Sequence, residues 1–485
     1  MNRPEVGQAV ADLGRTLDAL AAAQTGWPGP AALGRPAPGR PEAAPRPDVD
    51  WGLVVVLRRA ASEEITAASQ RWGGEHGRTM DREDRRMMGR SVIRQVVRRH
   101  AEDLARNGQA LWSLEQEQAC AAAVEDAIFG YGRLQPLFEI PEAENIEIHG
   151  WDSVVVHYGD GRREQHPPVA DSDEELVEAI RFLAESASPS RPFDDAHPMM
   201  TLALGDRFRL HAIGFGLSFR PSIVIRHHIL TDISLRRLAD GQMMPHEVAA
   251  LLHDAVLARK SMVVSGDQGA GKTTLLRALI DAIPPTERFG TLETDYELLT
   301  HLQPGRRNIL ALQARAGMGE RAADGSRAGE FTVTDLLPEA LRQNLSRLVV
   351  GEVRGGEAAA MFEAMQSGAG ALCTTHSHSA SSTMDRLASR VAQGGVLGME
   401  EAYRQIAHNI HLLVHVRLVD DTWRGGTRRR HVAEVRALTG GIEQGRPITH
   451  LVYRAATATA PAVWHPDPQL LEELAEFAGS YEAMP

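Results

Sequence analysis

Eight consecutive residues, Gly266-Asp267-Gln268-Gly269-Ala270-Gly271-Lys272-Thr273, form a complete G-x-x-x-x-G-K-[ST] phosphate-binding motif. The glycines allow the backbone to curl, so that successive N–H groups point at phosphate oxygens. Lys272 would reach the β- and γ-phosphates of a nucleoside triphosphate, and the Thr273 hydroxyl would ligate Mg²⁺. These eight residues and Thr274 are therefore the predicted binding site for ATP and Mg²⁺.

The segments beside the motif match the elements that such a loop needs. Met262–Ser265 is typical of a short buried strand, and Thr274–Ile280 has the apolar spacing of a helix packed on a sheet. The N-terminus of that helix would add partial positive charge at the phosphates. A glycine-rich turn that matched by accident would not combine strand, helix, lysine and threonine in this order.

A strand ending in a carboxylate supplies a second chemical group. Leu348–Gly351 is apolar and leads into Glu352, so it would deliver this acid to the carboxyl edge of the sheet, where ligands of such folds bind. There Glu352 could hold Mg²⁺ through water or polarise an attacking water. The alternative is a glutamate at a strand end that faces solvent.

Two further stretches add candidate catalytic residues. Thr291–Leu298 carries a cluster of acids that includes Glu293 and Glu297, although a solvated acidic turn would look the same. Small residues in Gly368–Thr375 lead to His376, which would reach the same sheet edge. Taken alone, such a histidine is as commonly structural as catalytic.

The order of apolar segments predicts the fold class. Candidate strands at 289–293, 309–312, 348–351, 371–375 and 410–417 alternate with helical patterns. This alternation predicts an α/β domain with a mostly parallel sheet, and the upstream mixture of strands and helices predicts a smaller α+β domain.

Composition divides the 485 residues into five predicted parts. They are a disordered Pro/Ala-rich tail (1–50), a helical region (51–140), an α+β domain (141–235), the phosphate-loop domain (236–455), and a linker with a C-terminal helix (456–485).

Charge and cysteine content exclude several classes of function. The formal net charge of -12 and the lack of segments that mix basic and aromatic residues argue against nucleic-acid binding. Two cysteines cannot build a four-ligand zinc site.

No apolar run approaches the ~18 residues that cross a bilayer, and no signal peptide opens the chain. We therefore expect a cytoplasmic protein, or one that partners attach to a membrane.

The ordered motifs together resemble the type II/type IV secretion ATPase superfamily, and most of all its CpaF/Tad branch. The resemblance covers roughly residues 125–440 and extends upstream to Gly130–Leu137, Asn145–Gly150 and Gly205–Ala212. The chain departs from the family pattern at Gly368-Ala369 and at His378.

This resemblance implies a RecA-like ATPase domain in a hexameric ring, with ATP between subunits. It also implies a location at the inner face of the cell membrane, where the ring drives an inner-membrane platform protein for pilus assembly or secretion. An arginine from the smaller domain would stabilise charge on the transferred phosphoryl group, and Arg209 and Arg226 are the candidates. A structural salt bridge is the alternative for each.

Three other functions fit parts of the pattern. One is a conjugation or type IV secretion ATPase that transfers DNA or protein. Another is a nucleotide-gated scaffold with little turnover. The third is a nucleic-acid motor, against which the acidic net charge argues.

Overall fold

The computed structural model describes residues 49–187, 191–230, 232–303, 305–315, 317–321, 327–355, 358, 361–362, 365, 370–393, 395 and 397–481. They form two compact units, one ending at Ile229 and the other beginning at Leu230. The expected disordered tail, up to residue 48, and Gly368-Ala369 lie outside the described residues.

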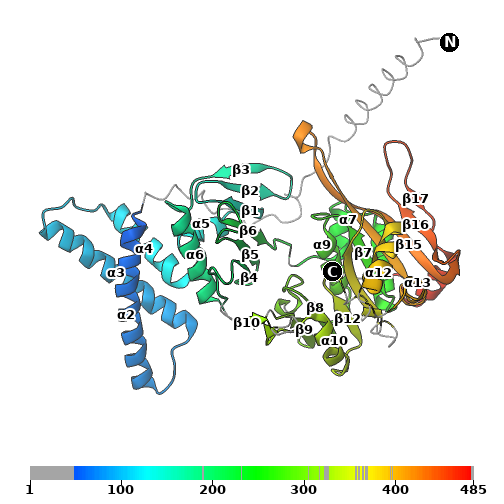
Figure 1. Cartoon of the computed structure of the whole chain (residues 1–485), viewed down its shortest axis with the longest axis horizontal. Coiled ribbons are helices and arrows are strands. Elements are labelled where there is room, and N and C mark those ends of the chain that lie inside the picture. The colour runs from blue at the N-terminus through cyan, green and yellow to red at the C-terminus, as the bar shows by residue number, and fades with distance from the viewer. Residues whose placement is uncertain are drawn as a thin grey trace, which may run out of the picture. The chain divides into compact units, whose positions relative to one another are not determined.

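The first unit opens with three helices (Figure 1). These are α2 (Trp51–His76), α3 (Arg82–Arg106) and α4 (Leu114–Phe129), followed by the short helices η2 (Gly132–Leu134) and α5 (Gln135–Phe138). Asp50 and Ser113 cap α2 and α4 by accepting backbone N–H groups of their first turns, as such residues do at helix starts. Apolar faces of the three helices pack on one another around Leu57, Ile93 and Val124.

An antiparallel sheet of six strands completes this unit, in the order β3-β2-β1-β6-β5-β4. The strands are β1 (Ala143–His149), β2 (Val154–Tyr158), β3 (Arg163–His166), β4 (Met199–Leu204), β5 (Phe208–Ile213) and β6 (Ser222–His227). Helix α6 (Asp173–Ser186) packs Leu176, Ile180 and Leu183 into the same core as the sheet. The structure thus contains the α+β arrangement expected from the sequence.

The second unit is built on a nine-stranded sheet with the order β17-β16-β15-β14-β7-β13-β12-β8-β9. Its strands are β7 (Met262–Gly266), β8 (Phe289–Glu293), β9 (Ile309–Gln313), β12 (Arg347–Val350), β13 (Gly370–His376), β14 (Leu412–Asp420), β15 (Arg428–Glu443), β16 (Arg446–Arg454) and β17 (Val463–Trp464). The six strands from β14 to β9 pair in parallel, and β15 to β17 add antiparallel pairs at one side.

Helices cover both faces of this sheet (Figure 1). They are α7 (Leu235–Asp240), α8 (His246–Leu257), α9 (Lys272–Asp281), α10 (Val333–Leu341), α12 (Ala380–Gln393), α13 (Met399–Asn409), α14 (Pro468–Leu474), and the short η3 (Thr300–Leu302), η4 (Thr422–Arg424) and η5 (Ala475–Phe477). Met262 and Val264 of β7 join the core under α8 and α9, whereas Val263 joins the core under α10 and α12. A strand buried on both faces is mostly apolar, as Met262, Val263 and Val264 are, and the buried hydroxyl of Ser265 is paired with His415. The predicted RecA-like α/β fold class is confirmed.

Two parts of this unit differ from the sequence-based expectation. The pair β15 and β16 extends the sheet where no strand was predicted, and a short hairpin of β10 (Met318–Arg321) and β11 (Arg327–Ala328) lies between β9 and α10. Among the described helices, none combines the length and the apolar character that a membrane span requires.

Candidate active site

The phosphate loop connects β7 to α9 through a backbone that only glycine fits well. Gly269 and Gly271 have φ angles of 74° and 93°, a region that L-residues with a side chain rarely adopt. Gly266 packs directly on β14, where a Cβ atom would overlap the carbonyl oxygen of Val416 and lie 2.9 Å from its Cγ2. Backbone sterics therefore fix three of the motif's positions before any ligand is considered.

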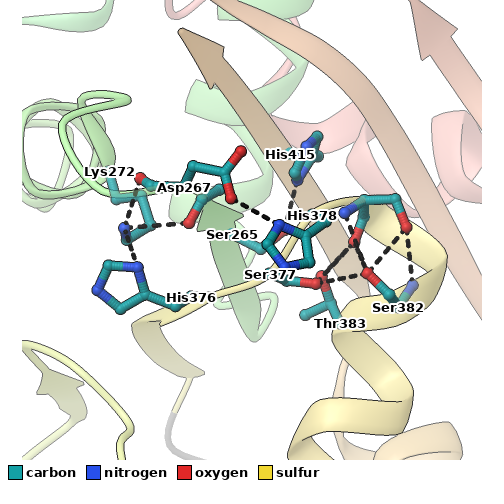
Figure 2. Close-up of polar contacts among 11 residues, drawn as sticks. Ser265, Asp267, Lys272, His376, Ser377, His378, Ser382, Thr383 and His415 are labelled. Atoms are coloured by element: carbon teal, nitrogen blue, oxygen red, sulfur yellow. Dashed lines mark hydrogen bonds and ion pairs between the residues drawn. The ribbon is translucent and has the colours of Figure 1, made fainter.

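Lys272 begins α9, and its ammonium group lies inside the curl of the loop (Figure 2). Its Nζ donates to the carbonyl oxygens of Gly266 at 3.1 Å and Asp267 at 3.0 Å. The side chain is buried, and its Nζ also lies 3.2 Å from Nδ1 of His376. The cation is thus held where phosphate oxygens would approach the loop.

Glu352 meets the same histidine from the other side. His376 Nε2 lies 2.9 Å from Glu352 Oε1, which is the distance of an ion pair but without the alignment of a good hydrogen bond. Arg354 Nη2 donates to Glu352 Oε2 at 2.7 Å. Burial raises the pKa of the Glu352 carboxyl, but His376 and Arg354 outweigh it and lower the pKa to about 2. The group is therefore a carboxylate at every ordinary pH.

Backbone pairing beyond the end of β12 explains why Glu352 and His376 come together. Val353 N–H donates to the carbonyl of Thr374 at 2.8 Å, and the Thr374 hydroxyl donates to the carbonyl of Gly351 at 2.6 Å. These bonds hold the residues after β12 against β13. Lys272 at the start of α9, His376 at the end of β13 and Glu352 after β12 consequently form one continuous set of contacts.

Glu293, at the end of β8, occupies a very different environment. It is buried, and its Oε1 accepts the N–H groups of Glu297 at 2.9 Å and Leu298 at 2.7 Å. A Cβ atom on Gly351 would lie 3.0 Å from Glu293 Cγ, so the carboxyl packs behind the residue that precedes Glu352. Burial raises the pKa of Glu293 to about 7, against the opposing effect of the two N–H donors.

The acidic turn after β8 is also held from the side of α9. Arg277, which is 3% exposed, donates Nε to the carbonyl of Glu297 at 3.0 Å and Nη1 to the carbonyl of Leu230 at 2.8 Å. Its Nη2 donates to the Glu297 carbonyl as well. The backbone of Glu297 is therefore fixed by Glu293 through its N–H and by Arg277 through its carbonyl.

The raised pKa of Glu293 predicts a pH dependence of stability. Unfolded, this carboxyl titrates near 4.5, and folded near 7, so the folded state binds the extra proton between these values. The stability of the folded state is thus highest below the unfolded pKa and falls, by on the order of 3 kcal/mol, as the pH rises through the folded pKa. Glu293→Gln removes this titration. Both proteins are measured without nucleotide. We expect the difference in melting temperature, variant minus wild type, to increase by several degrees between about pH 5 and about pH 8. A difference that does not change with pH would contradict the assignment.

The structure brings some predicted residues together and places others in different units. Lys272, Glu352 and His376 are in contact, and Thr273 and Thr274 lie half-buried in the first turn of α9. Arg209 and Arg226 belong to the other unit, where they are opposite each other on β5 and β6 and half-buried.

His378, where the chain departs from the family pattern, contacts the loop directly. Its Nδ1 lies 2.8 Å from Oδ1 of Asp267, and both side chains are exposed (Figure 2). An ion pair so open to solvent contributes little to stability.

Sequence reasoning missed two arginines near this site. Arg354 pairs with Glu352, and its position in the same V-V-G-E-V-R-G stretch could have suggested it. Arg430, from β15, donates Nε to the carbonyl of Gly269 at 2.8 Å. No local signal indicates this contact, because the two residues are 161 positions apart.

The chain is similar in sequence to several known proteins. A model of the family described as "Type II/IV secretion system protein" matches residues 164–444. A putative conjugal transfer protein of Mycobacterium tuberculosis is 31% identical over 368 residues, which cover 73% of this chain and 93% of that protein. The type IV secretion system protein PtlH of Bordetella pertussis is 39% identical over 134 residues, covering 27% and 37%. Protein VirB11 of Agrobacterium fabrum is 31% identical over 184 residues, covering 37% and 50%.

Proposed function

Because this chain belongs to the family of type II/IV secretion system proteins, we propose that it is a motor that hydrolyses ATP to drive pilus assembly or secretion. The observation that carries the proposal is the set of contacts from Lys272 through His376 to Glu352. It connects the residue that would hold the β- and γ-phosphates to the acid that would act beside the γ-phosphate.

The residues of the site fit ATP and Mg²⁺. The positive φ angles of Gly269 and Gly271 curl the loop for phosphate, and Lys272 is buried in that curl. The Thr273 hydroxyl and the Glu352 carboxylate would hold Mg²⁺, for which oxygen ligands and an ionised acid are suitable. When bound, Mg²⁺ neutralises the charge that develops on the phosphates.

Glu352 and Glu293 receive separate roles in this proposal. The low pKa of Glu352 makes it a poor proton acceptor and suits it to hold Mg²⁺ or to orient water. The pKa of Glu293, about 7, suits a group that takes up a proton near neutral pH. Glu297 lies on the turn after β8, and Arg277 binds its backbone carbonyl. His376 contacts both Lys272 and Glu352, so a displacement of Lys272 would be transmitted to Glu352 through it.

The finer parts of the proposal concern assembly. We propose a hexamer in which ATP lies between subunits and Arg209 or Arg226 reaches the phosphates of a neighbouring subunit. The ring would lie at the cytoplasmic face of the inner membrane and act on a platform protein there. The ordered motifs favour the CpaF/Tad branch, hence a pilus. The names of the Mycobacterium and Bordetella relatives favour the second candidate, transfer by a conjugation or type IV secretion machine.

A turnover assay tests the motor function against its alternatives. We expect Mg²⁺-dependent release of phosphate from ATP that single-stranded DNA does not change, with Lys272→Ala as the inactive control. Tight nucleotide binding with turnover no faster than this control would instead indicate a nucleotide-gated scaffold. Stimulation by single-stranded DNA would indicate a nucleic-acid motor, and either result would overturn the proposal.

A further inference from the structure

Two arginines of β15 lie against the outside of the phosphate loop. Arg430 donates Nε to the carbonyl of Gly269 at 2.8 Å, and its Cδ would be 3.5 Å from a Cβ atom on Gly271. Arg428 Nη2 would be 3.7 Å from a Cβ atom on Gly269. Residues two apart on a strand share a face, so this face of β15 is directed at the loop.

The sheet order explains how such a distant segment reaches the motif. Strand β15 is antiparallel to β14, and β14 is the parallel neighbour of β7, from which the loop emerges. Val432 N–H also donates to the carbonyl of Met243 at 2.7 Å, which ties the same strand to the residues before α8. The start of β15 is thereby fixed beside the loop.

Arg430 provides a hydrogen-bond donor for one of the carbonyl groups of the curled loop. A loop whose N–H groups converge on phosphate must turn its carbonyl groups away, and those carbonyls need other donors. Lys272 donates to the carbonyls of Gly266 and Asp267, and Arg430 donates to that of Gly269. The peptide group after Gly269 is thus oriented by a side chain outside the motif.

We propose that Arg430 is a positioning residue for nucleotide binding, which keeps the N–H groups of the loop converged by holding the Gly269 carbonyl through Nε. This inference rests on the proposed binding of ATP at the loop. It adds to that function a determinant of affinity that acts without touching the nucleotide. The hydrogen bond, and not the charge of Arg430, is the feature that matters.

Two substitutions separate the hydrogen bond from the charge. In Arg430→Gln, the side-chain amide nitrogen occupies the same bonded position as Nε, so a donor remains while the charge is lost. In Arg430→Lys the charge remains, but the ammonium lies one bond farther along the chain. Arg430→Met removes both. Arg429→Met is the matched control, because Arg429 is exposed and lies on the opposite face of β15.

The test measures the Kd of a non-hydrolysable ATP analogue with Mg²⁺, at fixed salt, together with kcat and KM. We expect Arg430→Met and Arg430→Lys to raise Kd and KM about tenfold, with little change in kcat, which corresponds to one lost hydrogen bond. Arg430→Gln and Arg429→Met should bind like wild type. Without nucleotide, the melting temperature should fall by at most a few degrees in Arg430→Met and Arg430→Lys, as the loss of one hydrogen bond implies, and should stay at the wild-type value in Arg430→Gln and Arg429→Met.

Other outcomes overturn the inference in distinct ways. If Arg430→Lys retains wild-type affinity and Arg430→Gln loses it, the charge of Arg430 determines affinity and the positioning role is wrong. Wild-type affinity in Arg430→Met removes any role in binding, and if the melting temperature of that variant is lowered as well, the contact is merely structural. Failure of wild type itself to bind the analogue would instead refute the proposed function.

Discussion

Replacing Glu352 by glutamine is expected to lower ATP turnover by about 10²–10⁴-fold while ATP still binds. Glutamine keeps the shape of the side chain and can still contact His376 and Arg354, so the arrangement at the end of β12 should persist. It lacks the negative charge, and the charge is what an Mg²⁺ ion or an attacking water would need. The measurement is steady-state phosphate release, paired with the Kd of a non-hydrolysable analogue.

The comparison with Lys272→Ala makes this result specific. Removing the buried ammonium deletes the charge partner of the β- and γ-phosphates, so this variant should lose nucleotide binding and turnover together. Glu352→Gln should lose turnover alone. If Glu352→Gln hydrolyses ATP at the wild-type rate, Glu352 is not the acid that acts at the γ-phosphate.

Mixing two inactive variants is expected to restore activity if an arginine acts across a subunit interface. A subunit with Arg209→Ala would fail only toward its neighbour's ATP, and a subunit with Glu352→Gln would fail toward its own. In randomly co-assembled rings, about a quarter of the interfaces would combine an intact arginine with an intact glutamate. Activity should therefore rise from background to a sizeable fraction of wild type. The same experiment with Arg226→Ala identifies which arginine acts.

Co-expression of the two variants is the safer design, since slow exchange of subunits would otherwise hide the rescue. Each single variant must still fold and oligomerise, which light scattering checks. An active Arg209→Ala or Arg226→Ala protein excludes that residue at once. Co-assembled rings that stay inactive with both arginines would return Arg209 and Arg226 to a structural role on β5 and β6.

The parts of the site near the motif were predictable because local sequence determines them. Strand β7 is apolar at Met262, Val263 and Val264, because both of its faces are buried. The predicted strand 289–293 matches the bounds of β8, and Glu352 follows β12 where the apolar run ends. In such segments, burial, periodicity and turn chemistry all indicate the same element.

The missed strands show where local pattern fails. Only Val432, Val435 and Ala437 are fully buried on β15, and the register shifts between Val435 and Arg436. A bulge interrupts the alternation of period two that indicates a half-buried strand. Because β15 was not predicted, neither was Arg430, whose contact with Gly269 depends on the order of strands in the sheet. The pKa of Glu293 likewise depends on tertiary burial and could not be inferred from an acidic turn.

Arg277 sets a limit on transplanting this phosphate loop into another scaffold. Arg277 is 3% exposed, and its guanidinium donates to the carbonyl oxygens of Glu297 and Leu230, which lie outside α9. A graft that carried only the loop and α9 would bury that cation without these acceptors, at a cost of several kcal/mol. Lysine would be a poor substitute, because the guanidinium reaches the carbonyls of Glu297 and Leu230 with two different nitrogen atoms, whereas an ammonium group has only one. The smallest portable module therefore comprises the loop, α9, the acidic turn and the backbone at Leu230.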